Sequence, residues 1–297
     1  MKNQYFGDVG DYGKYALLRY LANNQIKLAI NWYLTADDGS NDGKHITYLE
    51  KNEMKNFDPE LFVALREMVR MGQRDIKSFE QRDMIPNAIY YSALLHTDGN
   101  TRDEKRVYRK NWHQQALCVC KEAELVFLDP DNGACEKEPK EAKSSIKYCY
   151  ADEIADYFSA GQNVVYYCSK GRRTYEQWEE TKELMKRRLP EAQTITITFH
   201  KGTQRSYIFV LHEEDYQRYM ELIQKFLQKW PKIFTEEKSR ESVSITETIK
   251  ERFSITNSQG VELSIEVCGD GFVNIRFSDQ KECLERISID DLFGKLR

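Results

Sequence analysis

Glu124-Leu-Val-Phe-Leu-Asp129-Pro-Asp131-Asn-Gly133 is an apolar run that ends in two carboxylates separated by a proline. A continuous apolar run of this length is typical of a strand buried on both faces, as in a parallel sheet. In open parallel sheets, ligands bind outside the carboxyl ends of the strands. The two acids therefore fall where a ligand site is expected, and the proline that restricts the backbone between them favours a functional role over a simple turn.

Helical and extended patterns alternate on both sides of this strand. The periodicity predicts strands over 28–34, 163–168, 194–199 and 206–211, with weaker extended character over 76–79. It predicts helices over 14–23, onward from an N-cap at Asp58, from an N-cap at Thr101 to about 123, and over 152–160, 175–188 and 215–229. This order favours an α/β, Rossmann-like fold with a mostly parallel sheet, to which the 194–211 hairpin adds an antiparallel edge.

The pattern changes near residue 238, after a polar segment that follows Trp230-Pro231. Three later stretches, 253–257, 261–267 and 272–277, alternate apolar and polar residues and are separated by glycine-containing turns. We therefore predict a Rossmann-like domain over 1–238 and a small antiparallel β-rich domain over 239–297. The second domain either binds a partner or caps a surface, and the sequence leaves both readings open.

The composition is that of a globular protein of 297 residues, with 40% hydrophobic and 31% charged residues. The net charge of −4 supplies no general attraction to nucleic acid or to an anionic membrane, so any nucleic-acid contact must come from a local patch. No apolar run is long enough to span a membrane and no signal region is visible, so we expect a cytoplasmic protein. The seven cysteines lack paired zinc-site spacings and are predicted to be reduced thiols. The oligomeric state is not predicted.

Two strand ends carry groups suited to ligand binding. The first is followed by Asp37, Asp38, Gly39 and Gly43, and the other by Asp129, Asp131 and Asn132. A carboxylate at such an edge can hold ribose hydroxyls, an amine or a divalent metal, and a glycine lets the backbone approach a ligand. The alternative is that these are ordinary turn residues. Among the histidines, His45 stands closest to this candidate pocket.

This arrangement resembles the class I S-adenosylmethionine-dependent methyltransferases over roughly residues 1–215. The shared order is a glycine-bearing loop after the first strand, an acidic-proline motif after that family's fourth strand, and a terminal antiparallel hairpin. In amino-methylating members the motif reads Asp-Pro-Pro-Tyr or Asn-Pro-Pro-Tyr; its acid or amide holds the target amine while the ring stacks on a flipped base. Asp129 and Pro130 match its first two positions, whereas Asp131 replaces the second proline and Asn132 replaces the aromatic residue.

The resemblance implies S-adenosylmethionine as cofactor and a nucleic acid or a related substrate as acceptor. Gly39 and Gly43, in place of the family's Gly-x-Gly, would let the loop approach the cofactor, and Asp37 or Asp38 would accept hydrogen bonds from its amino or ribose groups. Asp129 would orient the acceptor. The segment from Gly7 to Tyr15 is also similar to the glycine-aspartate-lysine opening of ribosomal-RNA adenine methyltransferases, as either a ligand loop or a turn packed on the sheet. The segments quoted above also resemble those of a bacterial protein family that has no assigned activity.

Two other functions compete with methyl transfer. Asp37, Asp38, Asp129 and Asp131 could instead bind Mg²⁺ in a phosphoesterase or nuclease, and Asp129-x-Asp131 resembles the nucleophile motif of haloacid-dehalogenase-type phosphatases. The third possibility is a non-catalytic nucleotide- or nucleic-acid-binding module.

Two basic groups could contact nucleic acid. Lys170, Arg172 and Arg173 follow the strand at 163–168, beside Tyr166, Tyr167 and Trp178, and interleaved cations and aromatic rings suit nucleic acid. The other group, between Arg102 and Lys110, is equally well explained as a solvated helix face.

Overall fold

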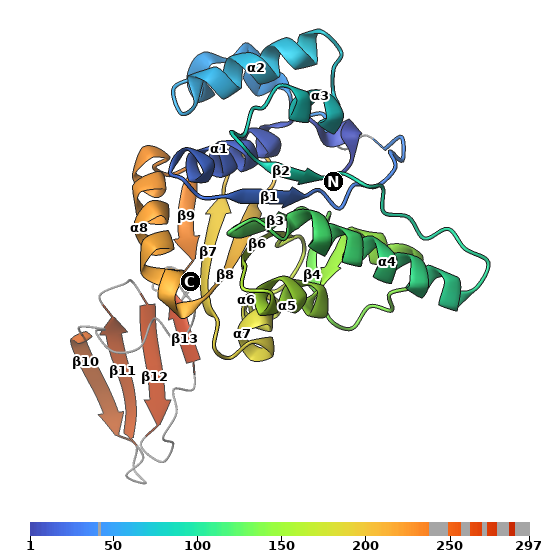
Figure 1. Ribbon diagram of the computed structural model, residues 1–297. Helices are drawn as coiled ribbons and strands as arrows, with labels where there is room; N and C mark the ends of the chain where they lie inside the picture. Colours follow the sequence, from blue (N-terminus) through green and yellow to red (C-terminus); the bar gives the residue numbers. More distant parts are fainter. Residues whose placement is uncertain (41–42, 238–248, 257–261, 269–271, 278–284, 289–297) are drawn as a thin grey trace. The chain divides into compact units, whose positions relative to one another are not determined.

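The computed structural model describes residues 1–40, 43–237, 249–256, 262–268, 272–277 and 285–288 (Figure 1). By its internal contacts the chain divides into two units, Met1–Glu237 and Lys238–Arg297. The described part of the second unit is an antiparallel sheet in the order β10-β11-β12-β13. These strands are β10 (Ile249–Thr256), β11 (Glu262–Cys268), β12 (Phe272–Phe277) and β13 (Glu285–Ser288).

The first unit is built on a seven-stranded sheet in the order β2-β1-β3-β6-β8-β7-β9. Its strands are β1 (Leu28–Asn31), β2 (Ile89–Tyr91), β3 (Leu125–Leu128), β6 (Asn163–Ser169), β7 (Gln193–Phe199), β8 (Arg205–Leu211) and β9 (Phe234–Glu237). The first four pair in parallel, and β8 runs antiparallel between β6 and β7. The predicted α/β fold is therefore confirmed. The hairpin is not an edge, however, because β9 pairs with the outer side of β7.

Helices cover both faces of this sheet (Figure 1). One core contains residues of α1 (Val9–Asn23), α2 (Pro59–Arg70), α3 (Ile76–Gln81) and α8 (Glu213–Lys229). The other contains residues of α4 (Arg102–Cys120), α5 (Ala151–Ser159), α6 (Tyr175–Lys182) and α7 (Leu184–Arg188). Leu125 and Phe127 face the first core while Val126 faces the second, so the apolar run is buried on both sides as predicted.

The first helix begins at Val9, earlier than the predicted start at Lys14. Asp8 caps it by accepting a hydrogen bond from the Asp11 amide at 2.9 Å. Gly10 therefore lies inside the helix, and a Cβ at this position would lie 0.8 Å from Nη1 of Arg205. Gly10 and Gly13 thus permit close approach of the β7–β8 hairpin, while Gly7, with φ +78°, lies in the turn before the helix.

Other differences concern short elements. Residues 76–79 form part of α3, capped by Asp75, because a short apolar run does not distinguish a strand from a buried helix. The predicted helix over 175–188 is interrupted at Glu183. Strands β2, β4 (Gly133–Cys135), β5 (Tyr148–Tyr150) and β9 were not predicted, since three or four residues carry too little periodicity. The predicted N-caps Asp58 and Thr101 are confirmed.

A buried ion pair joins α4 to α5. Arg109 donates to the two carboxylate oxygens of Glu153 at 2.7 and 2.9 Å, and each side chain is only 3% exposed. Arg109 also donates to the carbonyls of Ser145 and Tyr148, and Glu153 accepts from the Tyr33 hydroxyl at 3.1 Å. Arg109 is therefore not part of a solvated basic face. It ties the segment that follows the acidic loop to the end of β1.

The sequence predicts reduced cysteines and no membrane-spanning segment. The five cysteines of the first unit (Cys118, Cys120, Cys135, Cys149 and Cys168) are free thiols. No helix in the described part of the chain is long and apolar enough to cross a membrane.

Candidate functional site

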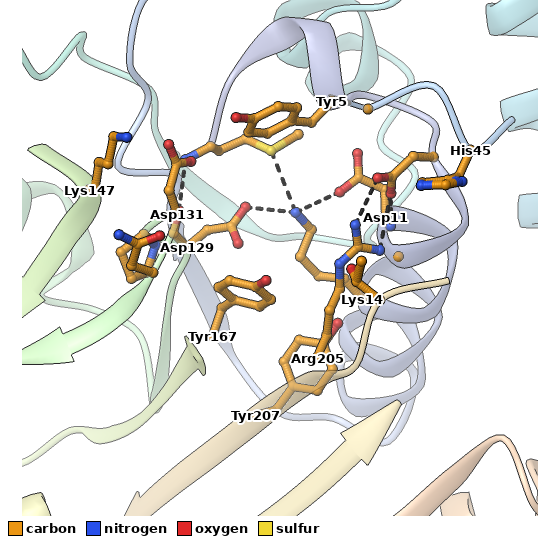
Figure 2. A pocket seen from close by; sticks show the side chains of 17 residues that line it. Tyr5, Asp11, Lys14, His45, Asp129, Asp131, Lys147, Tyr167, Arg205 and Tyr207 are labelled. Atoms are coloured by element: carbon orange, nitrogen blue, oxygen red, sulfur yellow. Dashed lines mark hydrogen bonds and ion pairs between the residues drawn. The ribbon is translucent and has the colours of Figure 1, made fainter. Parts of the chain in front are cut away.

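A pocket opens at the point where the order of strands reverses. From β1 the sheet continues to β2 on one side and to β3 and β6 on the other, which makes the carboxyl ends of β1 and β3 a topological switch point. The pocket has a volume of about 350 Å³, within the range of small-molecule sites. Its walls come from the loop after β3, the first turns of α1, the loop after β1, and the ends of β6 and β8 (Figure 2).

Lys14 lies at the centre of this pocket. Its ammonium nitrogen is 2.7 Å from Oδ2 of Asp129 and 2.8 Å from Oδ1 of Asp11, and all three side chains are buried (Figure 2). Burial alone would lower the pKa of Lys14, but the two carboxylates raise it above its ordinary value. Lys14 is therefore protonated at neutral pH and fixes the Asp129 carboxylate. No described residue donates a hydrogen bond to the other oxygen of Asp129, so a ligand can use it.

The second acid of the motif is bound to the start of the chain. Asp131 lies 3.2 Å from the α-amino nitrogen of Met1 and 3.7 Å from the ammonium nitrogen of Lys2. Lys2 also lies 2.6 Å from Asp38, and this hydrogen bond lowers the pKa of Asp38 below its ordinary value. The predicted acids of the two loops thus meet at one edge of the sheet, bridged by Lys2.

The predicted cofactor loop is only partly in the pocket. Gly43 and His45 line it, whereas Asp37, Asp38 and Gly39 do not, and Asp42 lies outside the described residues. Asp37 instead accepts a hydrogen bond from the Gln4 amide at 3.0 Å. Gly43 has φ +79°, and a Cβ there would lie 2.4 Å from the Gln4 carbonyl oxygen. The absence of a side chain at Gly43 therefore allows the N-terminal segment to pack against the loop.

Three tyrosines contribute aromatic surface. Tyr5, Tyr167 and Tyr207 line the pocket, and the rings of the latter two lie 6.3 Å apart at 63° (Figure 2). Burial raises the pKa of Tyr167 to about 12, so it stays neutral. The Tyr207 hydroxyl is buried and has no hydrogen-bond partner among the described residues.

Strand alternation explains why the predicted aromatic cluster beside the basic group is not formed. Tyr167 points into the pocket, whereas its neighbour Tyr166 is fully buried in the second core. Trp178 is buried in the same core, with 1% exposure. Of the three aromatic residues expected beside the cations, only Tyr167 is therefore available to a ligand in this pocket.

Arg205 forms the far wall of the pocket and was not predicted. It donates to both carboxylate oxygens of Asp8, at 3.2 and 2.7 Å, and so holds the first turn of α1 against the start of β8. The partners are 197 residues apart in sequence, so no local pattern could have indicated the contact.

A second pocket of about 350 Å³ adjoins the first through Asn132. The predicted basic residues Arg172 and Arg173 line it, while Lys170 does not. Asn132, the last residue of the motif, therefore lies beside two of the three residues predicted to contact nucleic acid.

The metal alternative has no cluster to support it in the described residues. No three His, Cys, Asp or Glu side chains there are grouped so that they could hold a metal ion. Asp129 and Asp131 each pair with cationic groups instead.

The titration of Asp11 should leave a signature in stability. Burial, partly offset by Lys14, raises the pKa of Asp11 from 3.8 to about 6, so the folded state favours its protonated form. The cost of burying the charge is fully present above pH 6 and disappears as the pH falls toward 3.8. Between pH 4.5 and 7.5, wild type should therefore lose on the order of 2 kcal/mol of unfolding free energy relative to Asp11→Asn. Urea unfolding at both pH values measures this difference; parallel pH profiles would contradict the assignment.

Comparison with known proteins places few limits on function. No family model matches the chain, and no curated protein matches it. Among solved structures, it is similar to the crystal structure of protein LPL1258 from Legionella pneumophila str. Philadelphia 1, a protein of family DUF519. The TM-score is 0.40 and the identity 14%, and the match covers 79% of this chain and 98% of the other. The function is therefore inferred from the pocket.

Proposed function

We propose that this protein transfers a methyl group from S-adenosylmethionine to a nucleic acid or a related substrate, in the cytoplasm. One observation carries the proposal. The Asp129-Pro130 motif, which matches the start of the amino-methyltransferase motif, lies in the wall of a pocket at the switch point of the sheet. Lys14 holds the carboxylate of that motif at 2.7 Å.

The groups in the pocket suit the ammonium and the flat ring of S-adenosylmethionine. S-adenosylmethionine supplies an electrophilic methyl group on a positively charged sulfur. Asp129 and Asp131 provide carboxylates, and Oδ1 of Asp131, which lies 3.2 Å from the Met1 ammonium, is buried and accepts no hydrogen bond of good geometry from the described residues. Buried polar atoms are seldom left without partners, so the Tyr207 hydroxyl, which has none among the described residues, is a suitable contact for a bound molecule.

The acceptor would be oriented by Asp129. Its carboxylate is fixed by Lys14 on one side and open on the other, which suits hydrogen bonding to an amine. Tyr5 and Tyr167 supply flat surfaces near this carboxylate, although Asn132 occupies the aromatic position of the motif. A planar base could therefore stack on rings that lie outside the motif. Positioning, rather than strong general-base action, is the main demand on these residues.

A transfer assay tests this function. Purified protein is incubated with S-adenosylmethionine carrying a tritiated methyl group and with RNA, single-stranded DNA or double-stranded DNA. We expect tritium in one of these polymers and none with boiled protein. Cofactor binding without transfer to any polymer or free nucleoside would favour the non-catalytic module. Mg²⁺-dependent phosphodiester cleavage without methyl transfer would contradict the proposal.

A further inference from the structure

The second pocket differs from the first in its charge. Seven residues line it (Asn132, Tyr148, Ser169, Gly171, Arg172, Arg173 and Gln177), and none is a carboxylate. Two arginines therefore give it a net positive charge, whereas four carboxylates and three basic side chains line the first pocket. A small polar hollow with arginines and no acid suits an oxyanion, because guanidinium groups match phosphate geometry.

The two arginines are arranged differently. Nη1 of Arg173 donates to the carbonyl oxygens of Ser169 and Lys170, which holds the guanidinium against the pocket wall. Arg172 is exposed and has no hydrogen bond or ion pair with the described residues. One cation is thus fixed in place, and the other can close on a ligand.

Asn132 connects this pocket to the proposed acceptor site. It lines both pockets, and its backbone amide donates to the Lys147 carbonyl at 2.8 Å. Lys147 also lines the first pocket, while its neighbour Tyr148 lines the second. Asn132, the residue after Asp131, therefore lies between the two pockets, and its backbone is hydrogen-bonded to Lys147.

We infer that the second pocket binds a phosphate group of the substrate, placed beside the acceptor that Asp129 orients. This inference rests on the proposed function and specifies its substrate: a phosphorylated nucleoside, either free or within a single strand, approaches over Asn132. Arg172 and Arg173, which line the pocket, would contact the phosphate. A nucleoside without phosphate would occupy only the first pocket.

Fluorescence anisotropy with a labelled 12-nucleotide single-stranded RNA tests the inference. Arg172→Glu/Arg173→Glu should weaken binding about tenfold or more, because each arginine makes a charge-assisted contact. The slope of log affinity against log salt should decrease by about 0.7, because the pocket holds one phosphate and each phosphate neutralised on a single strand contributes about 0.7 to that slope. Arg172→Glu alone should give part of both effects, which keeps the test valid if the double variant does not fold.

Arg187→Glu/Arg188→Glu is the matched control. It makes the same charge change at two adjacent exposed arginines at the end of α7, which precedes the start of β7 at the opposite edge of the sheet. It should leave RNA affinity within about twofold of wild type, because exposed charges that do not contact the RNA are screened by salt. Equal losses of affinity in the two double variants, or no loss in either, would overturn the inference.

Competition experiments separate the two sources of phosphate. If adenosine 5′-monophosphate displaces the RNA from wild type but not from Arg172→Glu, and adenosine competes equally with both proteins, a single phosphate is sufficient. If only oligonucleotides compete, and Arg172→Glu weakens them, the pocket holds a phosphodiester of the strand. Equal competition by the monophosphate and by adenosine, with unchanged oligonucleotide affinity in Arg172→Glu, would contradict a phosphate site. S-adenosylmethionine binding, measured separately, should be unchanged in Arg172→Glu, so failure of this inference is distinguishable from failure of the proposed function.

Discussion

Asp129→Asn is expected to slow methyl transfer roughly 10²- to 10³-fold, the usual effect of removing one preorganised electrostatic contact. The substitution keeps the shape of the side chain but removes the charge that faces the acceptor. Lys14 retains Asp11 at 2.8 Å, so the variant should fold. Initial rates of tritiated methyl transfer at saturating cofactor measure the effect.

Asp37→Asn is the matched control for this variant. It removes the same charge from an exposed acid in the loop after β1 that does not line the pocket. Its transfer rate should stay within about threefold of wild type, since exposed charges are strongly screened. Equal rates for the two variants would remove Asp129 from the proposed acceptor site.

Arg109→Met is expected to have the largest effect on stability. Removing one partner of a buried ion pair leaves the other charge uncompensated and costs about 3–5 kcal/mol. For a unit of this size, that corresponds to a fall in Tm of roughly 6–20 °C. Thermal unfolding followed by circular dichroism measures it. Arg106→Met, at a side chain that is 55% exposed and paired with Glu141 at 2.7 Å, should cost less than about 1 kcal/mol.

The ion pair also predicts sensitivity to acid. Burial alone would raise the pKa of Glu153, but Arg109 lowers it below the ordinary value of 4.5. The folded state thus favours the charged form, so this contribution is present above pH 4.5 and is lost as the pH falls below it. The difference in unfolding free energy between wild type and Arg109→Met should therefore shrink in acid. A difference that stays constant down to pH 3 would contradict this role.

Local patterns were sufficient for much of the fold. The apolar run before Asp129 predicted a central parallel strand, and the caps Asp58 and Thr101 were recognised because each satisfies backbone amides within its own helix. The start of α1 was missed because glycine is a poor helix former and the local pattern does not contain the packing that overrides it. The presence of glycine at position 10, inside a helix, is explained only by the side chain of Arg205, which lies against it.

The candidate site was predicted less completely than the fold. The motif from Asp129 to Asn132 was placed correctly at the edge of the sheet, since its position depends on a single strand. The contacts of Lys14 depend on elements distant in sequence, as do those of Arg205. The buried ion pair of Arg109 could not be predicted either, because the sequence does not distinguish a solvated charged residue on a helix from one paired in a core.

Calorimetric titration of the protein with S-adenosylmethionine, and separately with Mg²⁺, tests the central claim most directly. Wild type, Asp131→Ala and Asp37→Ala are compared, because Asp131 lines the pocket whereas Asp37 does not. The proposed function predicts micromolar binding of the cofactor by wild type and Asp37→Ala, and at least about tenfold weaker binding by Asp131→Ala. No heat with the cofactor, together with Mg²⁺ binding that Asp131→Ala abolishes, would contradict it.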